Sequence, residues 1–289
     1  IFAWQSYGLG NADIYARLVS ADGKLSMTDL RVNSTTRARG SYSQDQQSEP
    51  VLAPLNDGGA MVIWQSYGQD GSMFGIYGRK VSAAGKLEGS EFQVNQVTTY
   101  NQRTPAVTTM ANGNIVVVWV SEFERWGNPA DPYTAASIDV YGRIFDSLGN
   151  PVSGEKLLNS GTDSCANPAV AALPGGGFTV AWSQKDSESR SNSWDIIGRS
   201  FNDDGDATVG DFKINTTVYG DQYHPKISAV GSNCAVVWTS LGQDGSREGV
   251  YGRVLEAGNQ PTGEEFKVNT TTVSQQKFPT IASANNQFL

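Results

Sequence analysis

A short apolar run that ends in tryptophan recurs along the chain. Four copies read AMVIW, IVVVW, FTVAW and CAVVW, and a fifth, LIFAW, appears when the C-terminal leucine is read directly into the N-terminus. Continuous apolar runs of this length, bounded by Gly, Asn and Asp, are typical of β-strands that are buried on both faces. We therefore expect five equivalent core strands, each with a buried tryptophan near its end: Trp4, Trp64, Trp119, Trp182 and Trp238.

Each apolar run is followed by the same succession of positions. A loop leads to an apolar pair, a small residue and an arginine; a further strand then ends in asparagine, and a proline opens the next copy. The pattern predicts four short strands per repeat, the first of them directly after the proline. The arginines are Arg17, Arg79, Arg143, Arg199 and Arg253; the asparagines are Asn33, Asn95, Asn159, Asn215 and Asn269; the prolines are Pro50, Pro105, Pro168, Pro225 and Pro279.

The spacing of the repeats predicts a closed ring. Successive prolines are 55, 63, 57 and 54 residues apart, and the step from Pro279 through the chain ends to Pro50 is 60 residues. The step across the chain ends falls within the range of the other four, so a whole number of repeats is cut inside one of them. A ring accounts for this, because the two ends complete the split repeat. The sequence thus predicts an all-β, five-bladed β-propeller of four-stranded antiparallel blades, closed by pairing of the N- and C-terminal strands in one blade.

We expect one propeller domain over residues 1–289. Because the chain starts without methionine and inside a strand, we also expect a processed product or a fragment of a larger chain or assembly. The predicted blades comprise, in order, residues 279–289 plus 1–49, then 50–104, 105–167, 168–224 and 225–278.

Charge and composition exclude some classes of partner. The net charge of −8 and the pI of about 4.7 disfavour nucleic acids and anionic membrane surfaces. No apolar run approaches the roughly 20 residues of a membrane span, so membrane insertion is not expected. Cys165 and Cys234 fall at positions predicted to lie on opposite faces of the disc, so we expect two free thiols. No cofactor is expected.

Catalytic chemistry finds little support in the sequence. His224 is the only histidine and precedes a proline, where a surface position is expected, so histidine-dependent nucleophilic catalysis is disfavoured. The predicted inner strands, VLAPL, AVTTM, AVAAL, KISAV and TIASA, contain no Asp or Glu, and Lys226 is their only charged residue. Glycosidases use paired carboxylates, so we expect a non-enzymatic protein.

Two connections are long in every repeat, and strand alternation places both on one face. The loop QSYGQDGS of the second repeat returns in part as QSYGLGNAD and SLGQDGSRE. Planar polar groups beside an aromatic ring suit saccharides. The alternatives are Ca²⁺ binding by Asp and backbone carbonyls, or a turn that Asp and Gly merely shape. The candidate ligand-binding residues of these loops are Tyr7, Tyr67, Gln69, Asp70, Gln243 and Asp244.

The third repeat carries a longer version of this loop, residues 120–138, with Phe123, Trp126 and Tyr133. A long loop with several aromatic residues is typical of a contact surface or of a cap over a central channel. We therefore include Trp126 among the candidate ligand-binding residues.

Three of the repeated asparagines, Asn33, Asn215 and Asn269, lie in N-x-S/T sequons. Asn95 and Asn159 hold the same place without a sequon. We therefore expect a structural role for the asparagine, with any glycosylation incidental.

The whole repeat, GG-x-VVVWQS-x-GQDGS-x-GIYGR-x-F-x-x-x-G-x-x-x-G-x-EF-x-VN, resembles repeats of large secreted and surface-associated proteins, notably bacterial ones with calcium-binding RTX segments. The resemblance covers the chain and is strongest in the second and fifth repeats. It implies a fold and a secreted or cell-surface location, but no activity. The expected disc is also similar in architecture to five-bladed lectins of the tachylectin-2 type.

The sequence favours a non-enzymatic extracellular binding module that presents similar loops on one face. A glycan is the expected ligand, since weak repeated sites gain by multivalency. The alternative is a structural or adhesive spacer domain of a larger surface protein, which binds protein partners through the long loop of the third repeat. A glycoside hydrolase is the least favoured reading.

Overall fold

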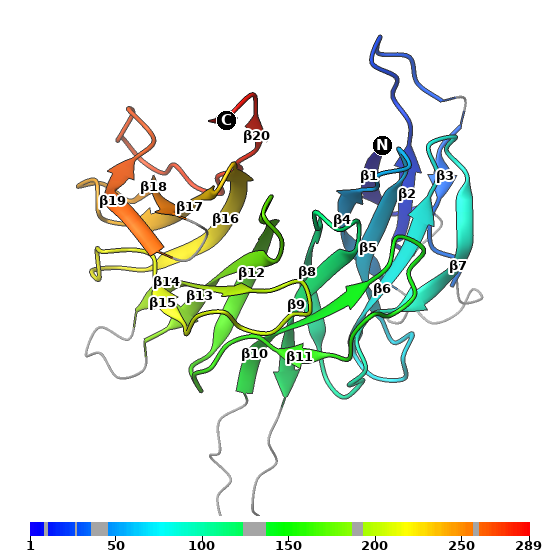
Figure 1. Cartoon of the computed structure of the whole chain (residues 1–289), viewed down its shortest axis with the longest axis horizontal. Helices are drawn as coiled ribbons and strands as arrows, with labels where there is room; N and C mark the ends of the chain where they lie inside the picture. The colour runs from blue at the N-terminus through cyan, green and yellow to red at the C-terminus, as the bar shows by residue number, and fades with distance from the viewer. Residues whose placement is uncertain (9–10, 27, 36–45, 124–136, 187–192, 257–259) are drawn as a thin grey trace, which may run out of the picture. The chain divides into compact units, whose positions relative to one another are not determined.

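The computed structural model describes residues 1–8, 11–26, 28–35, 46–123, 137–186, 193–256 and 260–289. The regular elements in these ranges are β-strands (Figure 1). Within the same ranges, no helix is long and apolar enough to cross a membrane.

Four of the sheets have four antiparallel strands each, arranged in chain order. The first two consist of β4 (Gln47–Pro54), β5 (Ala60–Tyr67), β6 (Phe74–Val81) and β7 (Leu87–Gln93), and of β8 (Gln102–Thr109), β9 (Ile115–Phe123), β10 (Ser137–Phe145) and β11 (Lys156–Leu157). The next two consist of β12 (Cys165–Ala172), β13 (Phe178–Lys185), β14 (Trp194–Phe201) and β15 (Phe212–Lys213), and of β16 (Gln222–Val230), β17 (Asn233–Leu241), β18 (Glu248–Glu256) and β19 (Gln260–Lys267). These sheets are the second to fifth predicted blades.

The strands predicted to form the remaining blade lie at the two ends of the chain and form two separate sheets. β1 (Phe2–Ser6), β2 (Asp13–Arg17) and β3 (Leu30–Arg31) form a three-stranded sheet. β20 (Ser283–Ala284) pairs with β21 (Gln287–Phe288). The all-β architecture is that of a five-bladed propeller, as predicted. Pairing of the terminal strands with each other stays a prediction.

The chain forms two compact units. The first comprises Ile1–Thr109, Gly113–Glu124 and Arg143–Glu155. The second comprises Met110–Asn112, Arg125–Gly142 and Lys156–Leu289. The prediction of one domain over residues 1–289 stays a prediction.

The second strand of the second to fifth blades forms the core, as its apolar sequence predicts. The first blade corrects the expectation of five equivalent core strands, because Trp4 in β1 is only partly buried and Phe2 is exposed. Trp64, Trp119, Trp182 and Trp238 have no exposed surface. In the second compact unit, Trp238 of the fifth blade belongs to one apolar cluster with residues of the fourth blade, such as Ile196. The tryptophans therefore pack between blades, which is how a strand comes to be buried on both faces.

The first strand of each blade begins earlier than predicted. β4, β8, β12 and β16 start three residues before the proline, which lies inside the strand at a β-bulge where the register shifts. A proline has no N–H to donate to the ladder, and a bulge is one of the places where a strand tolerates it. The residue before each proline has a left-handed backbone, with φ between 51° and 58°: Glu49, Thr104, Asn167, His224 and Phe278.

This earlier start corrects the expected charge of the inner strands. β4 carries Glu49 and β8 carries Arg103, so Lys226 is not their only charged residue. Glu49 is exposed. The described inner strands therefore do hold one carboxylate, that of Glu49, whereas glycosidase chemistry uses two.

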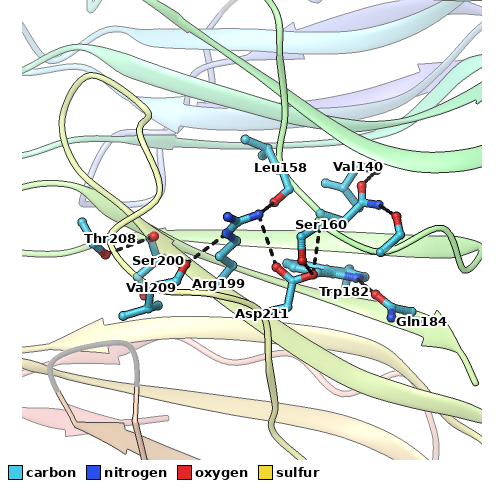
Figure 2. A network of polar contacts seen from close by, with 12 residues as sticks. Val140, Leu158, Ser160, Trp182, Gln184, Arg199, Ser200, Thr208, Val209 and Asp211 are labelled. Carbon is cyan, nitrogen blue, oxygen red and sulfur yellow. Dashed lines mark hydrogen bonds and ion pairs between the residues drawn. The ribbon is translucent and has the colours of Figure 1, made fainter.

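The repeated arginines join neighbouring blades through hydrogen bonds to backbone carbonyls. Arg199 donates from Nε to the Val209 carbonyl (3.1 Å) and from Nη1 to the Leu158 carbonyl of the preceding blade (2.9 Å). Asp211 completes the contact, with an oxygen 3.4 Å from Arg199 Nη1 (Figure 2). Equivalent bonds to the preceding blade join Arg79 to Val32, Arg143 to Val94 and Arg253 to Ile214.

Both cysteines are buried free thiols, as predicted. Cys234 lies in an apolar cluster, and burial raises the pKa of its thiol to about 11. Burial likewise raises the pKa of Cys165. Neither thiol is therefore ionised near neutral pH, which matches a packing role.

Candidate functional site

The repeated asparagine anchors the loops of each blade. Asn95 Oδ1 accepts the Ile76 N–H (2.8 Å), and its Nδ2 donates to the carbonyl of Val97 (2.8 Å). The same two bonds recur at Asn33, Asn159, Asn215 and Asn269. The asparagine is therefore structural, as expected. The sequon residues Asn33 and Asn215 are 1% and 2% exposed, so a glycan on either does not fit the folded chain.

An aspartate carboxylate lies beside this asparagine, and it comes from one of two positions in the repeat, the third strand or the loop before it. In the first, third and fourth blades it stands on the third strand, as Asp13, Asp139 and Asp195, and accepts the asparagine Nδ2 at 2.7 to 2.9 Å. In the second blade that position is Gly75, and the loop residue Asp70 lies over it, with Asn95 Nδ2 3.5 Å from its Oδ2. A Cβ on Gly75 would come within 2.5 Å of this oxygen.

In the fifth blade the loop aspartate has the equivalent place over the glycine, but its Oδ2 is buried without a hydrogen-bond partner among the described residues. Asp244 Oδ2 lies 2.9 Å from the place of a Cβ on Gly249. The loop aspartates Asp70 and Asp244 thus occupy the place of the strand aspartate, and each also accepts a backbone N–H two residues on, from Ser72 and Ser246. These contacts match the turn-shaping alternative for the loop.

The loop glutamines are held in the same way. Gln69 Oε1 accepts the Ser66 hydroxyl (2.7 Å), and Nε2 donates to Glu91 Oε1 (2.8 Å). Glu91 also accepts the Ser34 N–H (2.8 Å) and the Thr35 hydroxyl of the preceding blade. Both ends of the Gln69 amide are therefore occupied within the protein.

In the second compact unit, Gln243 bonds Ser240 and Glu265, and Glu265 accepts the Thr216 N–H of the preceding blade (2.8 Å). An acidic residue stands four positions before the asparagine in every repeat, a signal that the sequence reading missed: Asp29, Glu91, Glu155, Asp211 and Glu265. In the second to fifth blades this carboxylate accepts hydrogen bonds from the preceding blade and so latches it, whereas Asp29 of the first blade contacts Arg17 of its own blade.

The latch carboxylates and the loop aspartate differ electrostatically. Burial opposes ionisation of Glu91 and Glu265, but hydrogen bonds from the preceding blade outweigh it and hold the pKa of each below its ordinary value. For Asp70, burial dominates and raises the pKa. The latches are therefore charged at neutral pH, as their contacts require.

The remaining predicted site residues are scattered. Tyr7 is 77% exposed, and Tyr67 packs edge-on against Phe74 with ring centroids 5.0 Å apart. Trp126 and Tyr133 lie outside the described residues. The structure thus gives internal partners to Gln69, Asp70, Gln243 and Asp244, and a role for any of the seven residues in ligand binding stays a prediction.

A different group of side chains gathers at the loop ends of β16 and β18, in the second compact unit. We call Tyr223, His224, Glu248, Gln275 and Phe278 the 223–278 cluster. The His224 ring contacts the rings of Tyr223 and Phe278, at centroid distances of 5.5 and 4.9 Å. Glu248 Oε1 lies 3.5 Å from the Tyr223 hydroxyl and 3.3 Å from Gln275 Nε2, and both donate to it.

The 223–278 cluster has unused hydrogen-bonding capacity. Glu248 Oε2 is buried and has no partner among the described residues. Burial, followed by the charge of Lys226, lowers the pKa of His224, which is therefore neutral at pH 7 and offers one donor and one acceptor. Phe278 is 58% exposed. The cluster combines an apolar ring surface with polar groups that are not fully paired.

Sequence reasoning missed this cluster for an identifiable reason. His224 and Phe278 both stand before a proline, where the repeats carry unrelated residues, and this position was read as a rim outside the first strand. The bulge instead places His224 within β16, whereas Phe278 lies outside the strands. The signal that points to this cluster is a repeat position where the side chain changes although the backbone conformation stays the same.

Metal binding finds no support in the described part of the chain, where no group of three His, Cys, Asp or Glu side chains is arranged to hold an ion.

Comparison with known proteins identifies the fold. No protein-family profile matches the sequence, and no curated protein matches it. Among solved structures, a protein of unknown function from Dyadobacter fermentans is 12% identical and has a TM-score of 0.55, with 94% of this chain and 76% of that chain covered. The α-L-arabinanase of Penicillium chrysogenum, solved with arabinobiose, is 18% identical with a TM-score of 0.52, covering 88% and 70%. An α-L-arabinofuranosidase from Lactobacillus brevis is 11% identical with a TM-score of 0.50, covering 93% and 95%. The chain shares the propeller fold of these proteins, and at such identities the likeness extends to the fold alone.

Proposed function

We propose that this chain is a non-catalytic glycan-binding module of a secreted or cell-surface protein. The observation that carries the proposal is the 223–278 cluster. Saccharides are bound by aromatic rings that cover the apolar face of the sugar and by planar polar groups that bond its hydroxyls. Phe278 and His224 supply the rings, and Glu248, Gln275 and Tyr223 supply the polar groups.

The energetics of Glu248 support a ligand that donates hydrogen bonds. A buried carboxylate oxygen without a donor costs about 1–3 kcal/mol, and more when charged. A sugar hydroxyl, brought to Glu248 by a small side-chain adjustment, would recover this free energy. The charge of Glu248 also raises the pKa of Tyr223, after burial, so the phenol keeps its proton and remains a donor.

The non-catalytic part of the proposal rests on the same cluster. Glycosidases of both stereochemical classes need two carboxyl groups about 5 to 10 Å apart. The 223–278 cluster contains one, Glu248. Several proteins of the same fold are glycosidases, such as the arabinofuranosidase from Lactobacillus brevis, and this supports a sugar as the class of ligand.

A glycan-array screen of the purified chain, followed by calorimetric titration of the best ligand, tests the proposal. His224→Asn is the sharpest variant, because Asn167 occupies the equivalent left-handed position in the fourth blade. We expect His224→Asn and Phe278→Asn each to weaken binding at least tenfold without changing the melting temperature. The matched control is Val273→Ala, in the same segment and 79% exposed.

Two outcomes contradict the proposal. One is the absence of any saccharide ligand at high protein concentration. The other is a ligand whose affinity is the same for the wild type, His224→Asn and Phe278→Asn.

The second candidate function is an adhesive spacer that binds a protein partner. It is favoured by three exposed apolar side chains on neighbouring loops of the fourth and fifth blades, Val218, Tyr219 and Leu241. Tyr219 is 76% exposed and lies beside Gly242. If this function holds, Tyr219→Ser weakens protein capture and leaves glycan titrations unchanged.

A further inference from the structure

A second polar network lies at the loop end of β8 and β9, in the first compact unit. Asn101 Nδ2 donates to Glu122 Oε2 (2.8 Å), and the Glu122 N–H donates to the Asn101 carbonyl (2.8 Å). Arg103 bonds the other Glu122 oxygen through both Nε and Nη2. We call Asn101, Arg103 and Glu122 the Arg103 network.

The Arg103 network is fixed in place by the loop of the second blade. Asn101 Oδ1 accepts the Phe74 N–H (3.4 Å), and the Tyr100 N–H donates to the Ser72 hydroxyl (3.0 Å). The rings of Tyr100 and Phe123 meet edge-on at the same strand ends, 6.1 Å between centroids. A guanidinium held in this way loses less freedom when it binds a ligand.

The network leaves N–H donors of Arg103 without a partner among the described residues. Glu122 spends one oxygen on Arg103 and the other on Asn101. The guanidinium has five N–H groups. The Nε–H and the inner N–H of Nη2 point to Glu122, whereas both N–H groups of Nη1 and the outer N–H of Nη2 have no partner among the described residues. The Arg103 side chain is 37% exposed. The free end of the fork has the geometry that takes two oxygens of one carboxylate.

We propose that the Arg103 network is a separate subsite for the carboxylate of an acidic sugar, such as a uronic or sialic acid. The free edge of Arg103 binds the two carboxylate oxygens, and the partly exposed ring of Phe123, which follows Glu122, supplies apolar surface at the same tip. The site is particular to the third blade. Arg103 stands two residues before the proline, where the other repeats carry Ser48, Ala166, Tyr223 and Lys277.

The choice of a saccharide as the source of the carboxylate rests on the proposed function. The net charge of −8 opposes long anionic polymers. A monosaccharide avoids this, because at physiological ionic strength exposed charges are screened beyond about 8 Å. The carboxylate is then recognised by the guanidinium group of Arg103 rather than by the overall electrostatic field of the protein.

Calorimetric titration with matched sugars tests the subsite: galacturonic acid against galactose, and glucuronic acid against glucose, with N-acetylneuraminic acid added. We expect each uronic acid to bind at least tenfold more tightly than its neutral partner. Arg103→Lys keeps the charge but loses the fork, and we expect it to abolish this preference while the melting temperature and the binding of neutral sugars stay unchanged.

The outcomes separate this inference from the proposed function. Equal affinity for acidic and neutral sugars, with no effect of Arg103→Lys, overturns the acidic subsite while Phe278→Asn still tests the 223–278 cluster. An acid preference that depends on Arg103 but not on Phe278 supports the subsite and counts against the 223–278 cluster. Failure of every sugar to bind overturns both.

Discussion

At the level of single residues, the two places of the aspartate are the most informative feature of the repeat. The carboxylate beside Asn95 comes from the loop residue Asp70, whereas the equivalent carboxylate in the first, third and fourth blades comes from the third strand. If the two positions are interchangeable, the loop aspartate has a structural role. A ligand assay on a variant that lacks it would then mistake a loss of structure for the loss of a ligand contact.

A double-mutant cycle tests this interchange. We expect Asp70→Ala to destabilise the chain by about 1 kcal/mol, because Asn95 loses an acceptor. Gly75→Asp alone is also destabilising, because its Cβ meets Asp70 Oδ2 at 2.5 Å. The combination of both changes should recover most of the loss. Chemical denaturation of the four proteins measures the coupling, and strictly additive losses would contradict the interchange.

The sequence predicted some residue roles well and others poorly. Trp64 and its equivalents were predictable because an apolar run with no polar face has to be buried. The bonds of the arginines to the preceding blade follow the same physical rule, because a charge on a largely buried strand has to be paired. The role of Asp70 was not predictable. Its carboxylate lies where Gly75 has no side chain, and only the folded loop shows that the two residues lie together.

At the level of elements, the bulge before each proline defines the first strand. Sequence reading placed the strand after Pro50 and its equivalents because proline is typical of strand starts. The structure extends β4 back to Gln47 and gives Glu49 a φ of 51°. A non-glycine residue in this conformation carries a cost of roughly 1–2 kcal/mol, and asparagine tolerates it best.

Substitution of the exposed Glu49 measures this backbone cost. We expect Glu49→Asn to stabilise the chain by about 0.5 kcal/mol and Glu49→Val to destabilise it by about 1 kcal/mol, because a β-branched residue is least compatible with positive φ. The same two changes at Ser48, whose φ is not positive, provide the control. Equal effects at the two positions would rule out the left-handed backbone as the cause.

The latch carboxylates between blades make the stability of the fold depend on pH. The pKa of Glu265 in the folded chain lies below its ordinary value. Its contribution to the free energy of unfolding is therefore present above the pKa of the unfolded state and is lost as pH falls through the pKa of the folded state. We expect Glu265→Gln to cost about 1 kcal/mol at pH 7, and the difference from wild type to shrink as pH falls below about 4. Thermal melts from pH 7 to pH 3 measure it.

Glu264 is the matched control for this prediction, since it is the exposed neighbour of Glu265 in β19. Glu264→Gln should leave both the stability and its pH dependence unchanged. A pH profile for Glu265→Gln that runs parallel to the wild type would show that the latch is not the titrating group.

At the level of the whole molecule, the repeat pattern predicted more than any single motif. It defined the number of blades, the order of strands within each sheet and the core strands, because these follow from periodicity and burial alone. It did not define the 223–278 cluster or the Arg103 network, because both depend on which side chains the loops bring together. Both proposed sites therefore lie at positions that differ between repeats.

Closure of the ring is the remaining consequence of the repeat arithmetic, and it can be tested directly. Val51 and Ile63 are partners in β4 and β5; by their places after the proline and before the tryptophan, Thr280 and Ala3 are their equivalents. We expect the variant with Ala3→Cys and Thr280→Cys to form an intramolecular disulfide under mild oxidation, since both native thiols are buried. A bond that links nearly the whole chain should add roughly 5 kcal/mol. Single-cysteine variants are the controls. A chain that gives only intermolecular dimers would mean that these two strands do not meet, and that the first blade is completed in another way.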